Sequence, residues 1–115
     1  MTVTKILSVV PVDDFDTSVA WYERLLGRHP DARPMAGLAD WHLTATAWVQ
    51  VYRDRERAGH TYLNFAVDDL AAHATDLASR GITLGEVTTT QKNAKLATTT
   101  DPDGNTITFV ENPST

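Results

Sequence analysis

Few side chains in this 115-residue chain could perform covalent or metal chemistry. There is no Cys, which excludes disulfides, a thiolate nucleophile and zinc sites built on thiolates. The sequence contains neither a Gly-x-Ser-x-Gly motif nor a Gly-rich phosphate loop with a Lys. The four His residues are too far apart in the sequence to indicate a cluster. What remains is a set of aromatic, amide and hydroxyl side chains, which favours ligand recognition over catalysis.

The amino-acid composition and the net charge limit the kinds of molecule that this protein could bind. The 42% hydrophobic and 22% charged content is typical of a folded protein with a real core. The net charge of −5 and the scattered basic residues exclude a nucleic-acid partner, since phosphate binding needs a cationic face, and they favour a cationic ligand. No apolar run approaches the roughly 20 residues of a membrane span, and no signal sequence is recognisable. We therefore expect a cytoplasmic protein without membrane association.

The elements that would position a site come from an internal repeat. Val12-Asp13-Asp14-Phe15 is matched 55 residues later by Val67-Asp68-Asp69-Leu70, and in both places an apolar stretch precedes the motif and a helical pattern follows it. Asp14 or Asp16 can cap the first helix and Asp69 the second, with Gly27 and Gly81 as the stops. Each copy therefore begins with a strand and a helix.

Turn residues divide the remainder of each copy into three short strands. The fold class predicted is α+β: two tandem βαβββ units, about 1–57 and 58–115, that form concave mixed sheets with helices on the outer face. Residues 1–115 then make one domain, which we expect to pair with a second copy as a homodimer. The expected strands are 6–12, 32–37, 40–44, 47–53, 61–67, 83–89, 95–100 and 106–111.

Strand alternation predicts which side chains face the concavity. The more uniformly apolar set, which includes Val10, Val12 and Phe109, should face the helices, because that side must be dry core. Leu7, Tyr62 and Thr108 would then face inward. A tight turn at Thr44-Ala45 would pair Trp41 directly with Trp48 on the concave face, where two indole rings offer contact to planar or cationic ligands.

Three segments resemble the vicinal oxygen chelate superfamily, which contains glyoxalase I, extradiol dioxygenases and bleomycin-resistance proteins. They are Pro11–Phe15 continuing through Ala20-Trp21-Tyr22-Glu23-Arg24-Leu25-Leu26-Gly27, then Asn64–Leu70, and then the turn Asp101-Pro102-Asp103-Gly104-Asn105. Together they cover nearly the whole chain and are specific for the fold. Fold alone does not settle function.

The resemblance also implies where a divalent metal would be held in the family's enzymes. Its positions on the first strand of each unit and on the last strand fall here on Leu7, Tyr62 and Thr108, and the inward positions of the fourth strand are Trp48, Gln50 and Tyr52. None is a His or a carboxylate, which are the usual ligands. The resemblance therefore implies the metal-free, bleomycin-resistance-like branch, with no metal and no cofactor.

We accordingly expect a protein that sequesters a small molecule, an antibiotic or related natural product that is aromatic or cationic, without transforming it. The alternative is an enzyme of the same fold: a metal-dependent lyase or dioxygenase, or a metal-free isomerase or cyclase that uses His60, Tyr62 or Glu111 as acid or base. A third alternative is an interaction module whose Trp residues lie at a subunit contact. The candidate ligand-binding residues are Trp41, Trp48, Gln50, Tyr52, Tyr62, Asn64 and Thr108; no catalytic residue is assigned.

Overall fold

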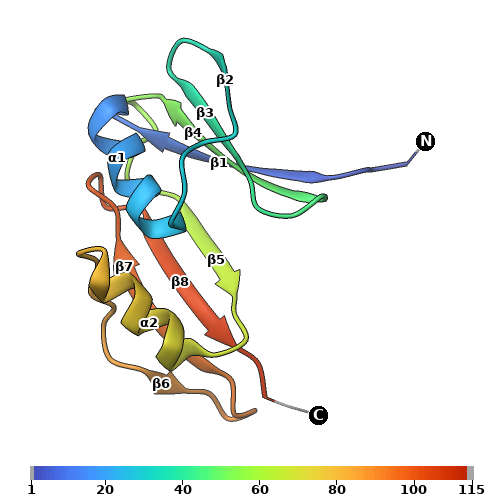
Figure 1. Ribbon diagram of the computed structural model, residues 1–115, viewed down its shortest axis with the longest axis vertical. Coiled ribbons are helices and arrows are strands. Elements are labelled where there is room, and N and C mark those ends of the chain that lie inside the picture. Colours follow the sequence, from blue (N-terminus) through green and yellow to red (C-terminus); the bar gives the residue numbers. More distant parts are fainter. Residues whose placement is uncertain (1, 114–115) are drawn as a thin grey trace.

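The computed structural model describes residues 2–113 and contains two βαβββ units in tandem, which confirms the predicted α+β fold class (Figure 1). Four of the eight expected strands have the predicted bounds. In the first unit the elements are β1 (Ile6–Val12), α1 (Phe15–Leu26), β2 (Ala32–Met35), β3 (Leu38–His42) and β4 (Ala47–Arg53). In the second they are β5 (Tyr62–Ala66), α2 (Leu70–Ser79), β6 (Thr88–Thr89), β7 (Lys95–Thr100) and β8 (Thr106–Glu111).

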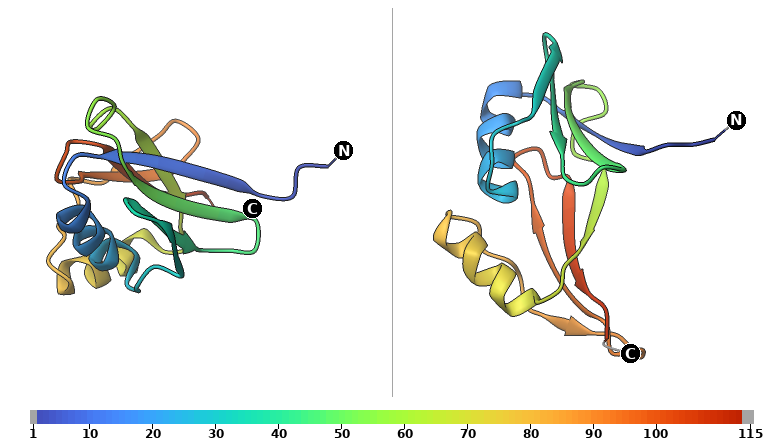
Figure 2. Two further views of the ribbon diagram at one scale, coloured as in Figure 1. Left: turned by 90° about the horizontal axis from the view of Figure 1, so that it is seen from above. Right: turned by 45° about the vertical axis from the view of Figure 1, so that its right-hand side comes forward.

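Each unit forms its own four-stranded sheet, with strand order β1-β4-β3-β2 in the first and β5-β8-β7-β6 in the second. The first strand of each unit pairs in parallel with the last, and the other pairings are antiparallel. Both helices lie on the same side of the two sheets (Figure 2). We call the opposite, helix-free side of each sheet its open face.

Both helices begin at the residues that the sequence indicates and α1 ends at the predicted Gly27, whereas α2 ends at Ser79 with Arg80 as its C-cap, one residue before Gly81. Asp14 is the N-cap of α1 and accepts a hydrogen bond from the Thr17 backbone N–H at 3.2 Å. Asp69 caps α2 in the same way. Gly27 ends α1 in the left-handed conformation, with φ of 71°, which a residue without Cβ adopts readily.

Strand β6 of the second unit and strand β3 of the first unit differ most from expectation. The segment expected to pair over 83–89 pairs only at Thr88–Thr89, because its Gly85 N–H already bonds the Thr98 carbonyl and Leu84 turns into the core. In the first unit β3 begins at Leu38 and ends at His42, two residues earlier than predicted. The consequences of that shift appear at the site.

The dry core lies between the sheets and the helices, as strand alternation predicts. Val10, Val12 and Ile107 are fully buried and Phe109 is 2% exposed. From α1, Tyr22 and its neighbours fill the first unit, while Leu70 and Leu77 from α2 fill the second. This arrangement leaves the alternate side chains of every strand on the open faces.

A buried polar network joins the two units at the turn between β7 and β8. The Asp101 carboxylate accepts hydrogen bonds from the Tyr22 hydroxyl at 2.8 Å and from the Asn105 side-chain amide at 2.7 Å. The same amide donates to the Pro11 carbonyl of β1, and the Asn105 side-chain oxygen accepts from the Thr61 N–H. Burial and the neighbouring Asp101 charge raise the pKa of Tyr22 above its ordinary value, so the phenol remains a donor.

Candidate functional site

The open face of the first sheet carries an aromatic and polar surface. Trp48, Gln50 and Tyr52 alternate along β4 and face away from the helices, while Val49 and Val51 between them are buried. Their parallel partners on β1 are Leu7, Val9 and Pro11. Leu7 and Val9 are 41% and 47% exposed, so apolar surface surrounds the aromatic rings.

The prediction that Trp41 faces Trp48 is wrong. Trp41 pairs with Val49, is fully buried on the helix side, and donates from its indole nitrogen to the Arg28 carbonyl at 2.9 Å. The turn is one residue longer than expected: the Thr44 hydroxyl accepts from the backbone N–H groups of Thr46 and Ala47. A shift of one residue in register turns every side chain of a strand to the other face.

The same shift places His42, instead of Trp41, beside Trp48. The imidazole stacks on the indole with ring centroids 3.5 Å apart and planes 14° apart. The Lys5 ammonium lies 3.6 Å from the centroid of the same indole. Because an imidazole at that separation leaves no room for a second group, Lys5 occupies the opposite face of the ring. Trp48 is therefore held between an imidazole and a cation.

Asp40 also lies on the open face of the first sheet, opposite Gln50. It is 4% exposed, and its carboxylate accepts a hydrogen bond from the Gln50 side-chain amide at 3.0 Å. The His42 Nε2 atom is buried, makes no hydrogen bond within the described structure, and lies 3.9 Å from the other Asp40 oxygen. A carboxylate is expensive to bury without a strong partner, which marks this position as unusual for a strand interior. The sequence reasoning did not single out Asp40, and with the expected register His42 would have pointed away from this face.

The open face of the second sheet is neutral and rich in hydroxyl groups. Tyr62 on β5 is 79% exposed, and Asn64 two residues later pairs with Thr108 on β8. The Thr108 hydroxyl shares a hydrogen bond with the Thr98 hydroxyl of β7 at 2.9 Å. This face offers hydrogen bonds without charge, in contrast to the first.

The structure brings two of the candidate residues together in one hollow. A cavity of about 400 Å³ lies where the β3–β4 turn approaches β5, and both Trp48 and Asn64 line it. This volume falls within the usual range for small-molecule pockets. Apolar side chains make up most of the remaining wall, which comprises Ser8, Leu43, Thr44, Ala47, Val49, Leu63, Phe65 and Ala66.

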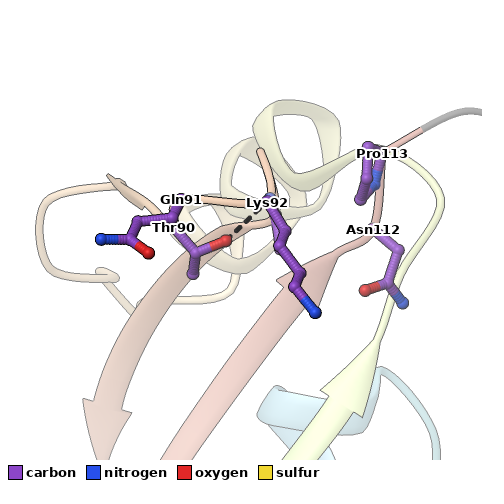
Figure 3. A pocket seen from close by; sticks show the side chains of 6 residues that line it. Thr90, Gln91, Lys92, Asn112 and Pro113 are labelled. Atoms are coloured by element: carbon purple, nitrogen blue, oxygen red, sulfur yellow. Dashed lines mark hydrogen bonds between the residues drawn. The ribbon is translucent and has the colours of Figure 1, made fainter.

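A second, larger hollow of about 540 Å³ lies at the far end of the second sheet. It is formed by the β6–β7 turn and the segment after β8, and Figure 3 shows Lys92 and Asn112 extending from these two places. Thr90 closes the turn by accepting a hydrogen bond from the Ala94 N–H. None of the candidate residues lies here, and among the described residues that line this hollow Lys92 alone is charged.

The residues at the family's metal positions do not suit a metal. Leu7 offers no donor, Tyr62 and Thr108 offer hydroxyl groups, and within residues 2–113 no three His, Asp or Glu side chains converge as a metal site would require. Glu111, considered above as an acid or base, faces the helix side, where it accepts a hydrogen bond from the Leu70 N–H at the start of α2. His60 is exposed just before β5.

In each unit the first strand pairs in parallel with the last, and a capped helix follows the first strand. Together with the turn that links the units, these features define a glyoxalase-type fold. The sequence pattern of the Glyoxalase/Bleomycin resistance protein/Dioxygenase superfamily matches residues 5–109. The chain belongs to this superfamily. A search of curated proteins finds no match. Among the helices that the structure describes, none has the length and apolar character needed to cross a membrane.

Solved structures of similar fold include members with different roles. A glyoxalase / bleomycin resistance protein from Catenulispora acidiphila is 32% identical, with a TM-score of 0.89, covering 96% of this chain and 99% of that one. An antibiotic-binding protein from Streptomyces is 20% identical with a TM-score of 0.77, covering 98% and 99%. A lactoylglutathione lyase from Agrobacterium tumefaciens is 17% identical with a TM-score of 0.74, covering 96% and 95%. At these last two identities the likeness shows the fold alone.

Proposed function

We propose that this protein binds a small organic molecule, an antibiotic or related natural product, and acts by sequestering it without a metal or cofactor. The observation that carries the proposal is the hollow of about 400 Å³ shared by Trp48 of the first unit and Asn64 of the second. An apolar wall with a few polar groups is typical of ligand pockets. The antibiotic-binding protein of the same fold gives a precedent for this use.

Each named side chain has a defined part in the proposal. Within the hollow Trp48 supplies the flat contact and Asn64 a hydrogen bond. On the adjoining open faces Tyr52 and Tyr62 add aromatic area, and Gln50 and Thr108 orient a part of the ligand that extends beyond the hollow. Trp41 is left out of this set, because its ring is buried on the helix side. The donors at the family's metal positions favour binding without metal.

The proposal includes a homodimer in which a second copy covers the open faces. Apolar side chains on the first open face, Leu7 and Val9, are 41% and 47% exposed, and Tyr62 on the second is 79% exposed. The free edge of β1 offers further backbone groups for pairing. A second copy would bury this surface and close the hollow against water.

The test is a mass measurement of the intact complex purified from its native cells. We expect the measured mass to equal that of a dimer plus a retained small molecule. The mass of that molecule should not change when it is stored with the protein, because it is not transformed. Trp48→Leu should lower the affinity for that molecule more than about tenfold, and Thr108→Val about threefold, because stacking exceeds one neutral hydrogen bond. Lys92→Ala, in the other hollow, serves as the matched control.

The outcomes separate the alternatives. If Lys92→Ala loses the molecule and Trp48→Leu keeps it, the binding site is the hollow beside Lys92 and not the one beside Trp48. A tightly held divalent metal would contradict the metal-free assignment. A monomer that retains the molecule would contradict the proposed homodimer but support the proposed binding function.

A second candidate function is metal-free proton transfer, which the Asp40 and His42 pair favours. The two side chains lie 3.9 Å apart, and the His42 ring stacks on Trp48, so an acid and a base lie together beside the indole. This function would replace sequestration if the wild type converts the retained molecule to a product and the His42→Gln variant leaves the molecule unchanged.

A further inference from the structure

The indole of Trp48 already holds a positive charge. The Lys5 ammonium lies 3.6 Å from the ring centroid, a separation at which the negative face of an aromatic ring attracts a cation. The other face is taken by the His42 imidazole, whose position is fixed by the pairing of β3 with β4. Any ligand that stacks on Trp48 must therefore take the face that Lys5 occupies.

Lys5 is the neighbour that is easier to displace. It lies in the irregular segment before β1, two residues after Val3, which is 84% exposed. The ladder that fixes the following residues begins with the bond from the Ile6 N–H to the Thr46 carbonyl. Within residues 2–113, Lys5 makes no ion pair with a carboxylate. Its contact with the ring is thus held by a flexible side chain on an unpaired segment.

The surroundings of the ring suit a cation attached to an apolar body. Leu7 lies beside Trp48 on β1 and is 41% exposed, and the hollow shared with Asn64 opens next to the indole. The buried Asp40 carboxylate lies on the same open face, next to the His42 ring that covers the far side of the indole. A negative charge in a partly desolvated site adds attraction for a cation.

We propose that Lys5 occupies the subsite of an organic cation, a protonated amine or quaternary ammonium carried by an aromatic or aliphatic body, which displaces it from Trp48. This inference rests on the proposed function and assigns the chemical class of its ligand. Residues 2–5 then act as an internal competitor: the fraction of protein with the ring uncovered sets the apparent affinity.

The experiment compares two probes of the same shape, (4-hydroxyphenyl)trimethylammonium and its neutral counterpart 4-tert-butylphenol. Binding is followed by NMR of the three Trp indole N–H groups. The Trp48 signal is identified by its absence in Trp48→Leu, and the retained Trp41 signal reports that this variant is folded. We expect the cation to shift the Trp48 signal and to bind about threefold more tightly than the neutral probe.

The Lys5→Ala variant provides the decisive comparison. It should bind the cationic probe roughly two- to fivefold more tightly than the wild type, and the preference for the cation over the neutral probe should persist. Lys92→Ala is the matched control for charge removal and should leave both affinities unchanged. Equal affinities for the two probes, or weaker binding of the cation by Lys5→Ala, would overturn the inference.

Failure of this inference is distinguishable from failure of the proposed function. Equal binding of both probes at Trp48 contradicts the cation subsite and supports a general binding face. Absence of any shift at Trp48 contradicts the subsite, whereas the proposed function is judged separately by the small molecule retained from native cells.

Discussion

The β3–β4 turn and the β7–β8 turn hold the same place in the two units, yet the chain uses them differently. The second, Asp101–Asn105, is partly buried and hydrogen-bonded to α1 and β1 of the first unit. The first, Thr44–Thr46, is exposed and closed by its own threonine hydroxyl. One turn joins the units together, and the other borders the candidate pocket. The duplicated scaffold thus uses one turn to hold the units together and leaves the other beside the candidate pocket.

The open faces of the two sheets also differ, in charge and in aromatic content. The first carries Trp48 with a histidine, a lysine and a buried carboxylate around it, whereas the second carries hydroxyl and amide groups without charge. Charge and aromatic surface select a ligand strongly, and neutral hydroxyl groups orient it at lower cost. Under the proposed function, the first unit would select the ligand.

The largest effect should follow from breaking the buried turn. Asp101→Ala removes an acceptor that serves the Tyr22 hydroxyl, the Asn105 amide and the Asp103 backbone N–H. Because the Tyr22 hydroxyl and one N–H of the Asn105 amide are then left without a partner in the interior, the free energy of unfolding should fall by about 3 kcal/mol. Urea denaturation measures the loss.

Two variants test the origin of that loss. Asp68→Ala removes an exposed carboxylate outside the network and should change stability by less than about 0.5 kcal/mol. Tyr22→Phe removes one donor alone and should cost about 1 kcal/mol. A loss for Asp101→Ala no greater than that for Asp68→Ala would show that the turn does not stabilise the pair of units.

A smaller effect is expected from the exposed turn. Thr44→Ala removes the hydroxyl that accepts from the Thr46 and Ala47 N–H groups, at 3.2 and 3.0 Å. Both donors can then bond water, so the free energy of unfolding should fall by only about 0.5–1 kcal/mol. Thr46→Ala, at a neighbouring exposed position, is the control. A loss equal to that of Asp101→Ala would erase the contrast between the two turns.

These turns also explain how far the sequence predicts the structure. The repeat, the caps and strands such as 47–53 and 106–111 follow from local pattern, because apolar alternation and capping residues act within a few positions. Alternation along β4 and β8 likewise placed Trp48, Gln50 and Thr108 on the open faces; their contact with a ligand stays a prediction. The Asp-Pro-Asp-Gly-Asn turn was predictable, but its bonds to Tyr22 and Pro11 are long-range.

The failure at Trp41 has a local cause. A two-residue hairpin turn normally needs residues that accept positive φ, and Thr44-Ala45 supplies none. That signal argued for a longer turn, which would have placed His42 and Asp40 on the open face. The contact of Lys5 with Trp48 has no comparable signal, because Lys5 lies in an unpaired segment without periodicity.

The smallest effect concerns the helices, where the repeat places His73 of α2 at the position of Ser18 in α1. Both side chains face the core and each has a buried atom without a hydrogen-bond partner in the described structure, Nε2 of His73 and Oγ of Ser18. The centroids of the His73 and Phe109 rings lie 4.6 Å apart. Burial, with a contribution from Arg80 that outweighs the opposing Asp76, lowers the pKa of His73 below 6.5.

This difference predicts a pH dependence at His73 that Ser18, at the equivalent position, cannot supply. Because the unfolded chain binds a proton at His73 more readily than the folded one, stability at this site is full above pH 6.5 and falls as the pH drops through that value toward the lower folded pKa. His73→Phe should flatten the decline in the free energy of unfolding between pH 7 and pH 5, measured by urea denaturation. Ser18→Ala, which removes an unpaired hydroxyl, should leave the slope as in the wild type. An unchanged slope in His73→Phe would show that the histidine is solvated and that the two helix positions are equivalent.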